Sequence, residues 1–176
     1  MSFVDTYNQL PEKKSKLLSK FESLIAPIDN AQLETLAAES QAITRKHFGK
    51  TMRMFAPLYV SNECVNNCQY CGFSRDNTEI LRTTLTVEQV VKEARHLYNL
   101  GFRNILLVAG EHPKFVSEGY LQKCIDAIKS FIPTVAIEVG PMEDDQYAEI
   151  VSHGCEGLIV YQETYDREKY LSLIHI

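Results

Sequence analysis

Residues 55–71 read Phe55-Ala-Pro-Leu-Tyr-Val-Ser-Asn-Glu-Cys-Val-Asn-Asn-Cys-Gln-Tyr-Cys71. The first part is a short apolar run with aromatic and β-branched residues, which is typical of a buried β-strand. The second part places three cysteines, Cys64, Cys68 and Cys71, close together in the chain. The segment therefore predicts a strand that ends in a loop whose thiols form a ligand set for a metal.

The sequence after this loop repeats the order helix, strand, polar loop. Thr86-Val-Glu-Gln89 is a capping-box pattern, and it begins an amphipathic helix that ends at Gly101. Further strands are predicted at residues 104–109, 134–139 and 157–162, and further helices at residues 117–131 and 143–153. Continuous apolar strands that alternate with amphipathic helices predict an α/β fold, in which helices cover a parallel sheet.

Polar residues gather where the predicted strands end. The cysteine loop, Glu111, Glu138 and Glu163 all lie at or just after such a point. The carboxyl ends of parallel strands meet at one rim, where an α/β barrel builds its active site. Three βα units and a fourth strand are fewer than a closed barrel needs. We therefore expect a partial barrel over residues 51–170.

Two amphipathic helices are predicted before the first strand, at residues 12–26 and 30–48. Asp29 or Asn30 can cap the second helix, and Gly49 can end it. We expect residues 1–50 to form an N-terminal helical extension to the barrel. Nothing in its residue pattern predicts chemistry.

Composition and charge exclude several classes of protein. The net charge of the 176-residue chain is −5, which does not suit a general nucleic-acid binder. No apolar stretch approaches the ~18 residues of a transmembrane helix. Early lysines interrupt any signal-peptide core, so we expect a cytoplasmic protein. Its five cysteines should then be reduced thiols rather than a disulfide framework.

The cysteine spacing favours an iron–sulfur cluster over a zinc ion. One loop can wrap three thiolates around a [4Fe-4S] cluster, which normally takes four cysteines, and one iron is then left open. A structural zinc site normally needs four ligands, and neither Cys124 nor Cys155 is an obvious fourth. A non-catalytic iron–sulfur or zinc module that binds a partner remains an alternative, as do three unrelated buried thiols.

The pattern CxxxCxΦC, with Tyr70 as the aromatic residue Φ, resembles the motif of the radical S-adenosylmethionine (SAM) superfamily. Within it, Cys71-Gly-Phe-Ser74, Leu107-Val-Ala-Gly-Glu-His112 and Val160-Tyr-Gln-Glu-Thr-Tyr165 are similar to the tyrosine-lyase family of 2-iminoacetate synthases. The resemblance covers roughly residues 30–170 and implies a partial TIM-type barrel. Tyrosine lyases of [FeFe]-hydrogenase cluster maturation share most of these motifs and are the alternative.

The resemblance also implies ligands. Cys64, Cys68 and Cys71 match the residues that bind a [4Fe-4S] cluster, and Tyr70 matches the aromatic position beside the adenine of SAM. The stretch Ala109-Gly110-Glu111 aligns with a Gly-Gly-Glu motif that holds the SAM amino group, although alanine replaces the first glycine. Gly110 would let the backbone approach a ligand closely.

Further candidates come from the predicted strands. Glu138 alternates with apolar residues that should face the helices, so its carboxylate should point into the barrel. Glu138 and Glu163 could contact the SAM ribose or the substrate and so act in catalysis, and a structural ion pair is the alternative for each. Tyr161, Gln162 and His112 are weaker candidates.

The implied reaction is cleavage of the Cα–Cβ bond of L-tyrosine to 2-iminoacetate (dehydroglycine) and p-cresol, for the thiazole moiety of thiamine. The implied partners are thiazole synthase and an electron donor such as flavodoxin or ferredoxin. Residues 171–176, Leu-Ser-Leu-Ile-His-Ile, do not resemble the family, and we interpret them as a possible artefact of a truncated reading frame. We expect such a fragment to bind a cluster without turning over tyrosine.

Overall fold

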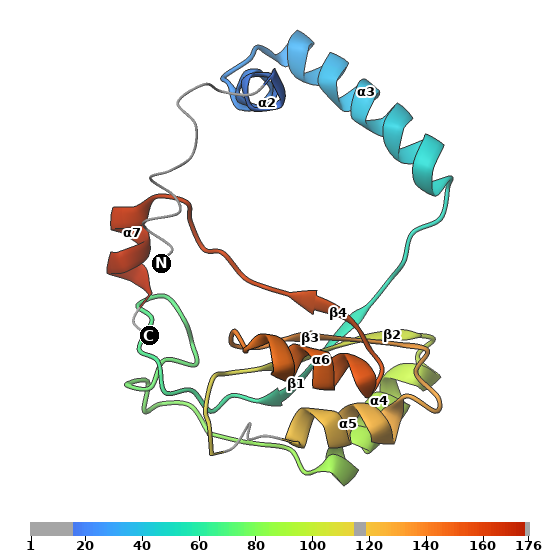
Figure 1. Ribbon diagram of the computed structural model, residues 1–176, viewed down its shortest axis with the longest axis vertical. Coiled ribbons are helices and arrows are strands. Elements are labelled where there is room, and N and C mark those ends of the chain that lie inside the picture. Colours follow the sequence, from blue (N-terminus) through green and yellow to red (C-terminus); the bar gives the residue numbers. More distant parts are fainter. Residues whose placement is uncertain (1–15, 115–118, 175–176) are drawn as a thin grey trace. The chain divides into compact units, whose positions relative to one another are not determined.

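The computed structural model describes residues 16–114 and 119–174. The chain divides into two compact units, of which the first ends at Met52 and the second begins at Arg53 (Figure 1). The second unit contains the cysteines and all the predicted strands. No helix in the described ranges is long and apolar enough to cross a membrane.

The first unit contains two helices, α2 (Lys16–Ile25) and α3 (Asn30–Phe48). Asp29 caps α3, because its side chain accepts a hydrogen bond from the backbone N–H of Gln32. Gly49 ends α3 with a φ of 66°, a conformation that glycine adopts without a steric penalty. Both predicted helices are confirmed, although residues 12–15 of the first lie outside the described residues.

The second unit is built on a parallel sheet whose order is β1-β2-β3-β4 (Figure 1). Each strand pairs with the next one in the chain, as expected when every crossover is a helix or a long loop. The predicted α/β class is therefore confirmed. The strands are β1 (Ala56–Ser61), β2 (Asn104–Ala109), β3 (Thr134–Glu138) and β4 (Cys155–Ile159).

Three amphipathic helices supply the core against one face of the sheet. They are α4 (Val87–Asn99), α5 (Tyr120–Ile128) and α6 (Asp144–Ser152). The predicted capping box of α4 is present, with Thr86 and Gln89 bonded reciprocally. The helix predicted at residues 117–131 is shorter in the structure, and residues 117 and 118 lie outside the described residues. Alternate residues of β2 and β3 meet these helices in one buried cluster.

The predicted position of the fourth strand was wrong by two to three residues. The strand was expected at 157–162, but β4 is Cys155–Ile159. The cause is its neighbour, because the last pair of the β3–β4 ladder is Glu138 with Ile159, and β3 ends at Glu138. Residues 160–162 have no partner in the ladder, because β3 offers no residue beyond Glu138.

A short helix that the sequence reasoning missed, α7 (Arg167–Leu173), follows β4. Asp166 caps it by accepting a hydrogen bond from the N–H of Lys169. The helix includes the first three residues of the stretch 171–176, whose last two residues lie outside the described residues. The interpretation of that stretch as an artefact stays a prediction.

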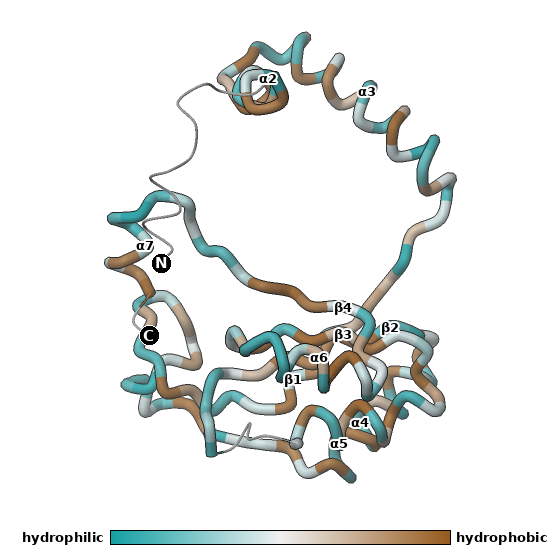
Figure 2. The backbone as a smooth tube through the Cα atoms, in the orientation of Figure 1, coloured by the Kyte–Doolittle hydropathy of each residue, from teal (hydrophilic) through white to brown (hydrophobic). Residues whose placement is uncertain are grey.

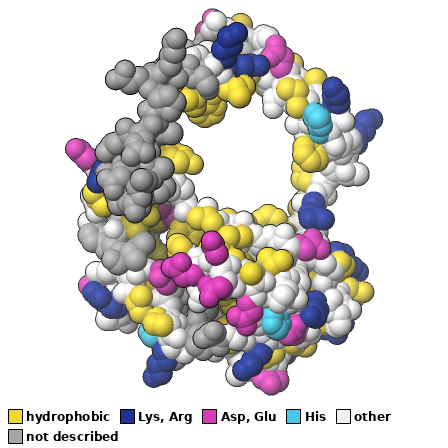
Figure 3. All heavy atoms as spheres, viewed as in Figure 1, with side chains coloured by type: hydrophobic (Ala, Val, Ile, Leu, Met, Phe, Trp, Pro, Cys, Tyr) yellow, Lys and Arg dark blue, Asp and Glu magenta, His cyan; other side chains and the backbone are white. Residues whose placement is uncertain are grey.

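The apolar side chains at the end of β4 are only partly covered. Leu158 and Ile159 are 41% and 40% exposed, and β4 is one of the most hydrophobic segments in Figure 2. The start of α6 bears three exposed acidic residues, Glu143, Asp144 and Asp145, and acidic side chains gather on this unit in Figure 3. Their charge is favourable at a helix N-terminus.

Candidate functional site

The cysteines lie in a long loop whose two ends are tied together at the carboxyl end of β1. Ser61 and Thr84 form an antiparallel bridge, and their side-chain oxygens are 2.8 Å apart. Beyond them, the N–H of Leu85 donates to the carbonyl of Val60 at 2.9 Å. The loop therefore leaves and returns at one point of the rim, as the sequence predicted for a strand that delivers a ligand loop.

Backbone hydrogen bonds fold the loop tightly around its second and third cysteines. The N–H of Cys71 donates to the carbonyl of Cys68 at 3.3 Å, and the N–H of Ser74 donates to the carbonyl of Cys71 at 3.0 Å. The Ser74 hydroxyl also donates to the carbonyl of Cys68. Cys64, Cys68 and Cys71 are all free and half-buried, and they line one cavity of about 410 Å³.

The three thiols surround this cavity rather than converging on a point. Within residues 16–114 and 119–174, no three Cys, His, Asp or Glu side chains are placed to hold one metal ion. Two thiolates on one tetrahedral zinc, with Zn–S bonds of ~2.3 Å, would lie only ~3.8 Å apart. A [4Fe-4S] cluster instead takes its cysteines on separate irons. The donor set therefore fits a cluster better than a preformed zinc site.

Tyr70 and Glu163, predicted separately, meet across the cavity. Both residues line it. Partial desolvation, followed by the nearby carboxylate of Glu163, raises the pKa of Tyr70 above its ordinary value. The loop after β4 is thereby brought against the cysteine loop.

Glu138 and Tyr161 line the same cavity from the sheet. Glu138 is the last residue of β3 and pairs with Val108 of β2, which also lines the cavity, so the predicted inward orientation is confirmed. Desolvation, followed by the charges of Glu111, Cys64 and other cavity groups, raises the pKa of Tyr161 to about 12.

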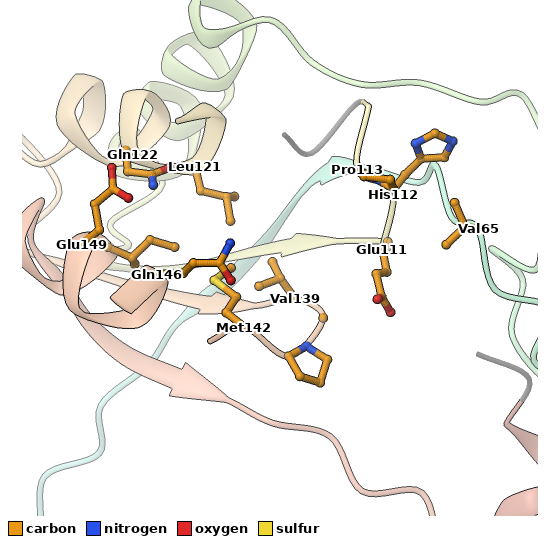
Figure 4. A pocket seen from close by; sticks show the side chains of 14 residues that line it. Val65, Glu111, His112, Pro113, Leu121, Gln122, Val139, Met142, Gln146 and Glu149 are labelled. Atoms are coloured by element: carbon orange, nitrogen blue, oxygen red, sulfur yellow. The ribbon is translucent and has the colours of Figure 1, made fainter. Parts of the chain in front are cut away.

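Glu111 follows β2 and is bonded to the cysteine loop twice. Its Oε2 accepts a hydrogen bond from the Asn66 Nδ2 at 2.8 Å, and its backbone carbonyl accepts from the N–H of Val65 at 2.8 Å. Glu111 lines the cysteine cavity and also a second cavity of about 360 Å³ between α5 and α6 (Figure 4). Asn66, only 8% exposed, is a contact that sequence reasoning missed.

Gly110 allows two backbone segments to approach closely. A Cβ built on Gly110 would lie 2.3 Å from the carbonyl oxygen of Glu63 and 3.2 Å from the Cβ of Cys64. Glycine is therefore required here for the approach of the cysteine loop itself, and the expected approach of a ligand stays a prediction. The preceding residue, Ala109, is buried at the end of β2 and also lines the cysteine cavity.

Arg82 is a second residue that sequence reasoning missed. Its guanidinium donates to the backbone carbonyls of Asn62, Phe73 and Ser74 at 2.6 to 2.8 Å, and to that of Asn77 at 3.2 Å. One partly buried side chain thus joins the start of the loop to the segment after its last cysteine. An arginine among polar residues gives no sequence signal for such a role.

Two weaker candidates lie outside the cysteine cavity. Gln162 donates to the carbonyl of Thr164 at 2.7 Å within its own turn. His112 borders the second cavity, and its side chain projects away from that of Glu111 (Figure 4). The structure does not bring either one to the cysteines.

Helix α7 closes one side of the cavity. The N–H of Gln69 donates to the carbonyl of Leu173 at 3.0 Å, and Tyr170 and Ile174 line the cavity. The end of the described chain therefore contacts the cysteine loop directly.

The carboxylates of the cavity have no cationic partner in the described part of the chain. None of the ion pairs formed there uses Glu111, Glu138 or Glu163. The structural ion pair that was the alternative for Glu138 and Glu163 is thus not formed among these residues. Three carboxylates that share one cavity without a cation among the described residues make its potential negative, so the cavity favours a ligand with positive charge.

Comparison with known proteins gives matches over most of the chain. A family model described as the Radical SAM superfamily matches residues 58–175. The 2-iminoacetate synthase of Escherichia coli K12 is 38% identical over 148 residues, which cover 84% of this chain and 39% of that protein. The chain thus spans about two fifths of the length of this curated relative.

Solved structures agree with the sequence matches. The [FeFe]-hydrogenase maturase HydG from Carboxydothermus hydrogenoformans superposes with a TM-score of 0.81 and 30% identity, over 92% of this chain and 38% of that one. Methylornithine synthase (PylB) superposes with a TM-score of 0.70 and 26% identity, over 86% of this chain and 45% of that one. The predicted partial TIM-type barrel is confirmed by this likeness.

Proposed function

The chain belongs to the radical SAM superfamily, and we propose that it is the cluster- and SAM-binding part of a tyrosine lyase related to 2-iminoacetate synthase. One observation supports this most directly. Three free cysteines with the superfamily spacing surround a single cavity at the carboxyl end of β1. Acidic residues that follow β2 and β4, and the last residue of β3, line the same cavity.

In this proposal Cys64, Cys68 and Cys71 hold a [4Fe-4S] cluster. Together, the bound cluster and SAM supply one-electron cleavage of a sulfonium and hence a radical able to abstract hydrogen. The protein's part is to hold the ligands and exclude water. The loop is held in shape for its ligands by its closed base at Ser61 and Thr84 and by the carbonyl contacts of the Arg82 guanidinium.

Tyr70 and Ala109-Gly110-Glu111 would hold SAM. An ammonium group needs hydrogen-bond acceptors, and Glu111 offers a carboxylate that lines the cysteine cavity. Tyr70, 54% exposed at the cavity edge, offers a ring face for the adenine. Tyr70 and Glu111 each occupy the matching position of a superfamily motif.

Glu138 and Glu163 would contact the SAM ribose or the substrate, L-tyrosine. Both line the cysteine cavity, and neither forms an ion pair among the described residues. The ammonium of an amino acid would supply the missing positive charge. Glu163 lies close enough to Tyr70 for its carboxylate to raise the pKa of that hydroxyl. Thiazole synthase and an electron donor such as flavodoxin or ferredoxin are the proposed partners.

Anaerobic reconstitution tests the cluster and SAM assignments. We expect a brown protein with about four irons and four sulfides per chain, whose reduced electron paramagnetic resonance (EPR) spectrum changes when SAM is added. A colourless protein that takes up zinc in preference to iron would overturn the proposal in favour of a metal-binding module. Cys68→Ser is the control, because it removes one ligand from the loop.

A chimera tests the lyase assignment. In it, the matching segment of this chain replaces the 148 aligned residues of the E. coli enzyme. We expect the chimera to release p-cresol from tyrosine, and the same chimera with Cys68→Ser to release none. A chimera that binds SAM but forms no p-cresol would contradict the lyase assignment while leaving the superfamily assignment intact.

The likeness to HydG favours a second candidate, a lyase of [FeFe]-hydrogenase maturation. The same segment can be placed in the HydG framework and the maturation of hydrogenase measured. Activity in the hydrogenase framework alone would favour the second candidate. Activity in the thiazole framework alone would favour the first.

A further inference from the structure

The Glu111 carboxylate is confined from two directions. From the cysteine loop, the Asn66 amide donates to Oε2 at 2.8 Å. From the other direction, a Cβ on Gly140 would lie 3.0 Å from both Cγ and Cδ of Glu111. Only the absence of a side chain at Gly140 leaves room for the Glu111 side chain in this position. Figure 4 shows Glu111 between Val65 on one side and Val139 on the other.

Asn66 is well placed to impose this position. It is 8% exposed, and its own carbonyl accepts a hydrogen bond from the N–H of Arg75 at 2.8 Å. A hydrogen bond from a buried amide to a carboxylate is stronger than one between neutral groups. Oε1 forms no hydrogen bond within the part of the chain that the structure describes, so it is available to a ligand.

We propose that Asn66 is a positioning residue that, with Gly140, orients the Glu111 carboxylate toward the SAM ammonium. The inference rests on the proposed function, which makes Glu111 an acceptor for that group. Asn66 lies between Cys64 and Cys68, so its position depends on the conformation of the cysteine loop. SAM affinity is thereby coupled to the fold of the loop that holds the cluster.

The test compares two neighbouring asparagines in the full chain. Asn66→Ala removes the contact with Glu111, whereas Asn67→Ala removes an amide that donates to Asp76 Oδ2 at 2.7 Å. In anaerobically reconstituted protein, SAM is titrated against the reduced EPR spectrum. We expect Asn66→Ala to raise the Kd for SAM about 10-fold, which corresponds to ~1.4 kcal/mol, with iron content unchanged. Asn67→Ala should leave the Kd within about twofold of that of the wild type.

A double-mutant cycle shows whether Asn66 acts through Glu111. In a Glu111→Ala background, Asn66→Ala should cause no further rise in the Kd. If Asn66→Ala lowers iron content, Gly140→Ala takes over the test, because the three atoms nearest to its new methyl all belong to the Glu111 side chain and none to the cysteine loop. We expect Gly140→Ala to weaken SAM binding with normal iron content.

The outcomes separate the inference from the proposed function. Equal Kd values for the two asparagine variants, additive losses in the cycle, or normal SAM binding by Gly140→Ala would overturn the inference alone. A wild-type chain whose cluster gives no spectral response to SAM would overturn the proposed function, and the inference with it.

Discussion

Replacement of Gly110 by alanine should displace the cysteine loop while leaving the sheet core in place. Gly110 follows β2, and its N–H donates to the carbonyl of Ser61 at 3.0 Å. The added methyl would stand 2.3 Å from the carbonyl oxygen of Glu63, closer than the 3.0 Å that real Cβ atoms observe. The carbonyl oxygen belongs to the backbone and the new Cβ is bonded directly to the backbone, so neither can rotate away as the end of a flexible side chain could.

The size of the effect follows from this overlap. The gap between 2.3 Å and 3.0 Å means that the backbone at Glu63 must move by at least 0.7 Å. Overpacking of this kind costs ~1–3 kcal/mol of unfolding free energy. Cys64 is the next residue, and its Cβ would lie 3.2 Å from the same methyl, so the movement reaches the first thiol.

Urea unfolding and cluster reconstitution measure the two consequences. We expect Gly110→Ala to lower the unfolding free energy by ~1–3 kcal/mol and to reduce the iron bound per chain. Gly72→Ala is the matched control in the same loop, because a Cβ there meets nothing within 4 Å. It should change the unfolding free energy by less than ~0.5 kcal/mol. A Gly110→Ala chain with wild-type stability and iron content would refute the steric argument.

Three further outcomes are expected. Arg82→Ala should lower the unfolding free energy by ~2–4 kcal/mol, because four carbonyls lose a charged donor. The control Arg75→Ala loses an exposed ion pair and should lower it by less than ~1 kcal/mol. Equal losses for the two variants in urea unfolding would contradict this. In the reduced apo chain the three half-buried loop thiols should react quickly with a disulfide reagent and the two buried cysteines slowly, so five equally fast thiols would be inconsistent with the fold. Hydrogen bonds from Lys129 and His153 lower the pKa of Asp126. The stabilising contribution of Asp126 is therefore present above the unfolded-state pKa and is lost as the pH falls through the folded-state pKa. The difference in unfolding free energy between wild type and Asp126→Asn should shrink on acidification, and a difference independent of pH would count against this.

Sequence patterns predicted correctly the elements whose ends are set by residues close to them in the chain. The strand Asn104–Ala109 was predicted with the bounds that it has, because its apolar run is bracketed by polar residues and glycine. The capping box at Thr86 fixed the start of α4 in the same way. The end of β4 was mispredicted, because pairing with β3 sets it. Such pairing between distant segments leaves no trace in a local pattern.

The same distinction applies to the site. The cysteines, Glu111 and Glu138 were predicted because residue type and place on the rim suffice to find them. Asn66 was missed because its partner, Glu111, lies 45 residues away in the chain. A buried asparagine inside a ligand loop resembles an ordinary polar loop residue until the contact is seen.

Charge explains why these separately positioned residues make one site. Glu111, Glu138 and Glu163 come from the ends of three successive strands, and the loop thiols line the same cavity. The raised pKa of Tyr161, to which the charges of Glu111 and Glu138 contribute after desolvation, reports the negative potential there. A ligand of net negative charge would meet repulsion, whereas iron, a sulfonium and an ammonium would each reduce it. The described fold of residues 53–114 and 119–174 thus selects for positively charged groups through the ends of its own strands.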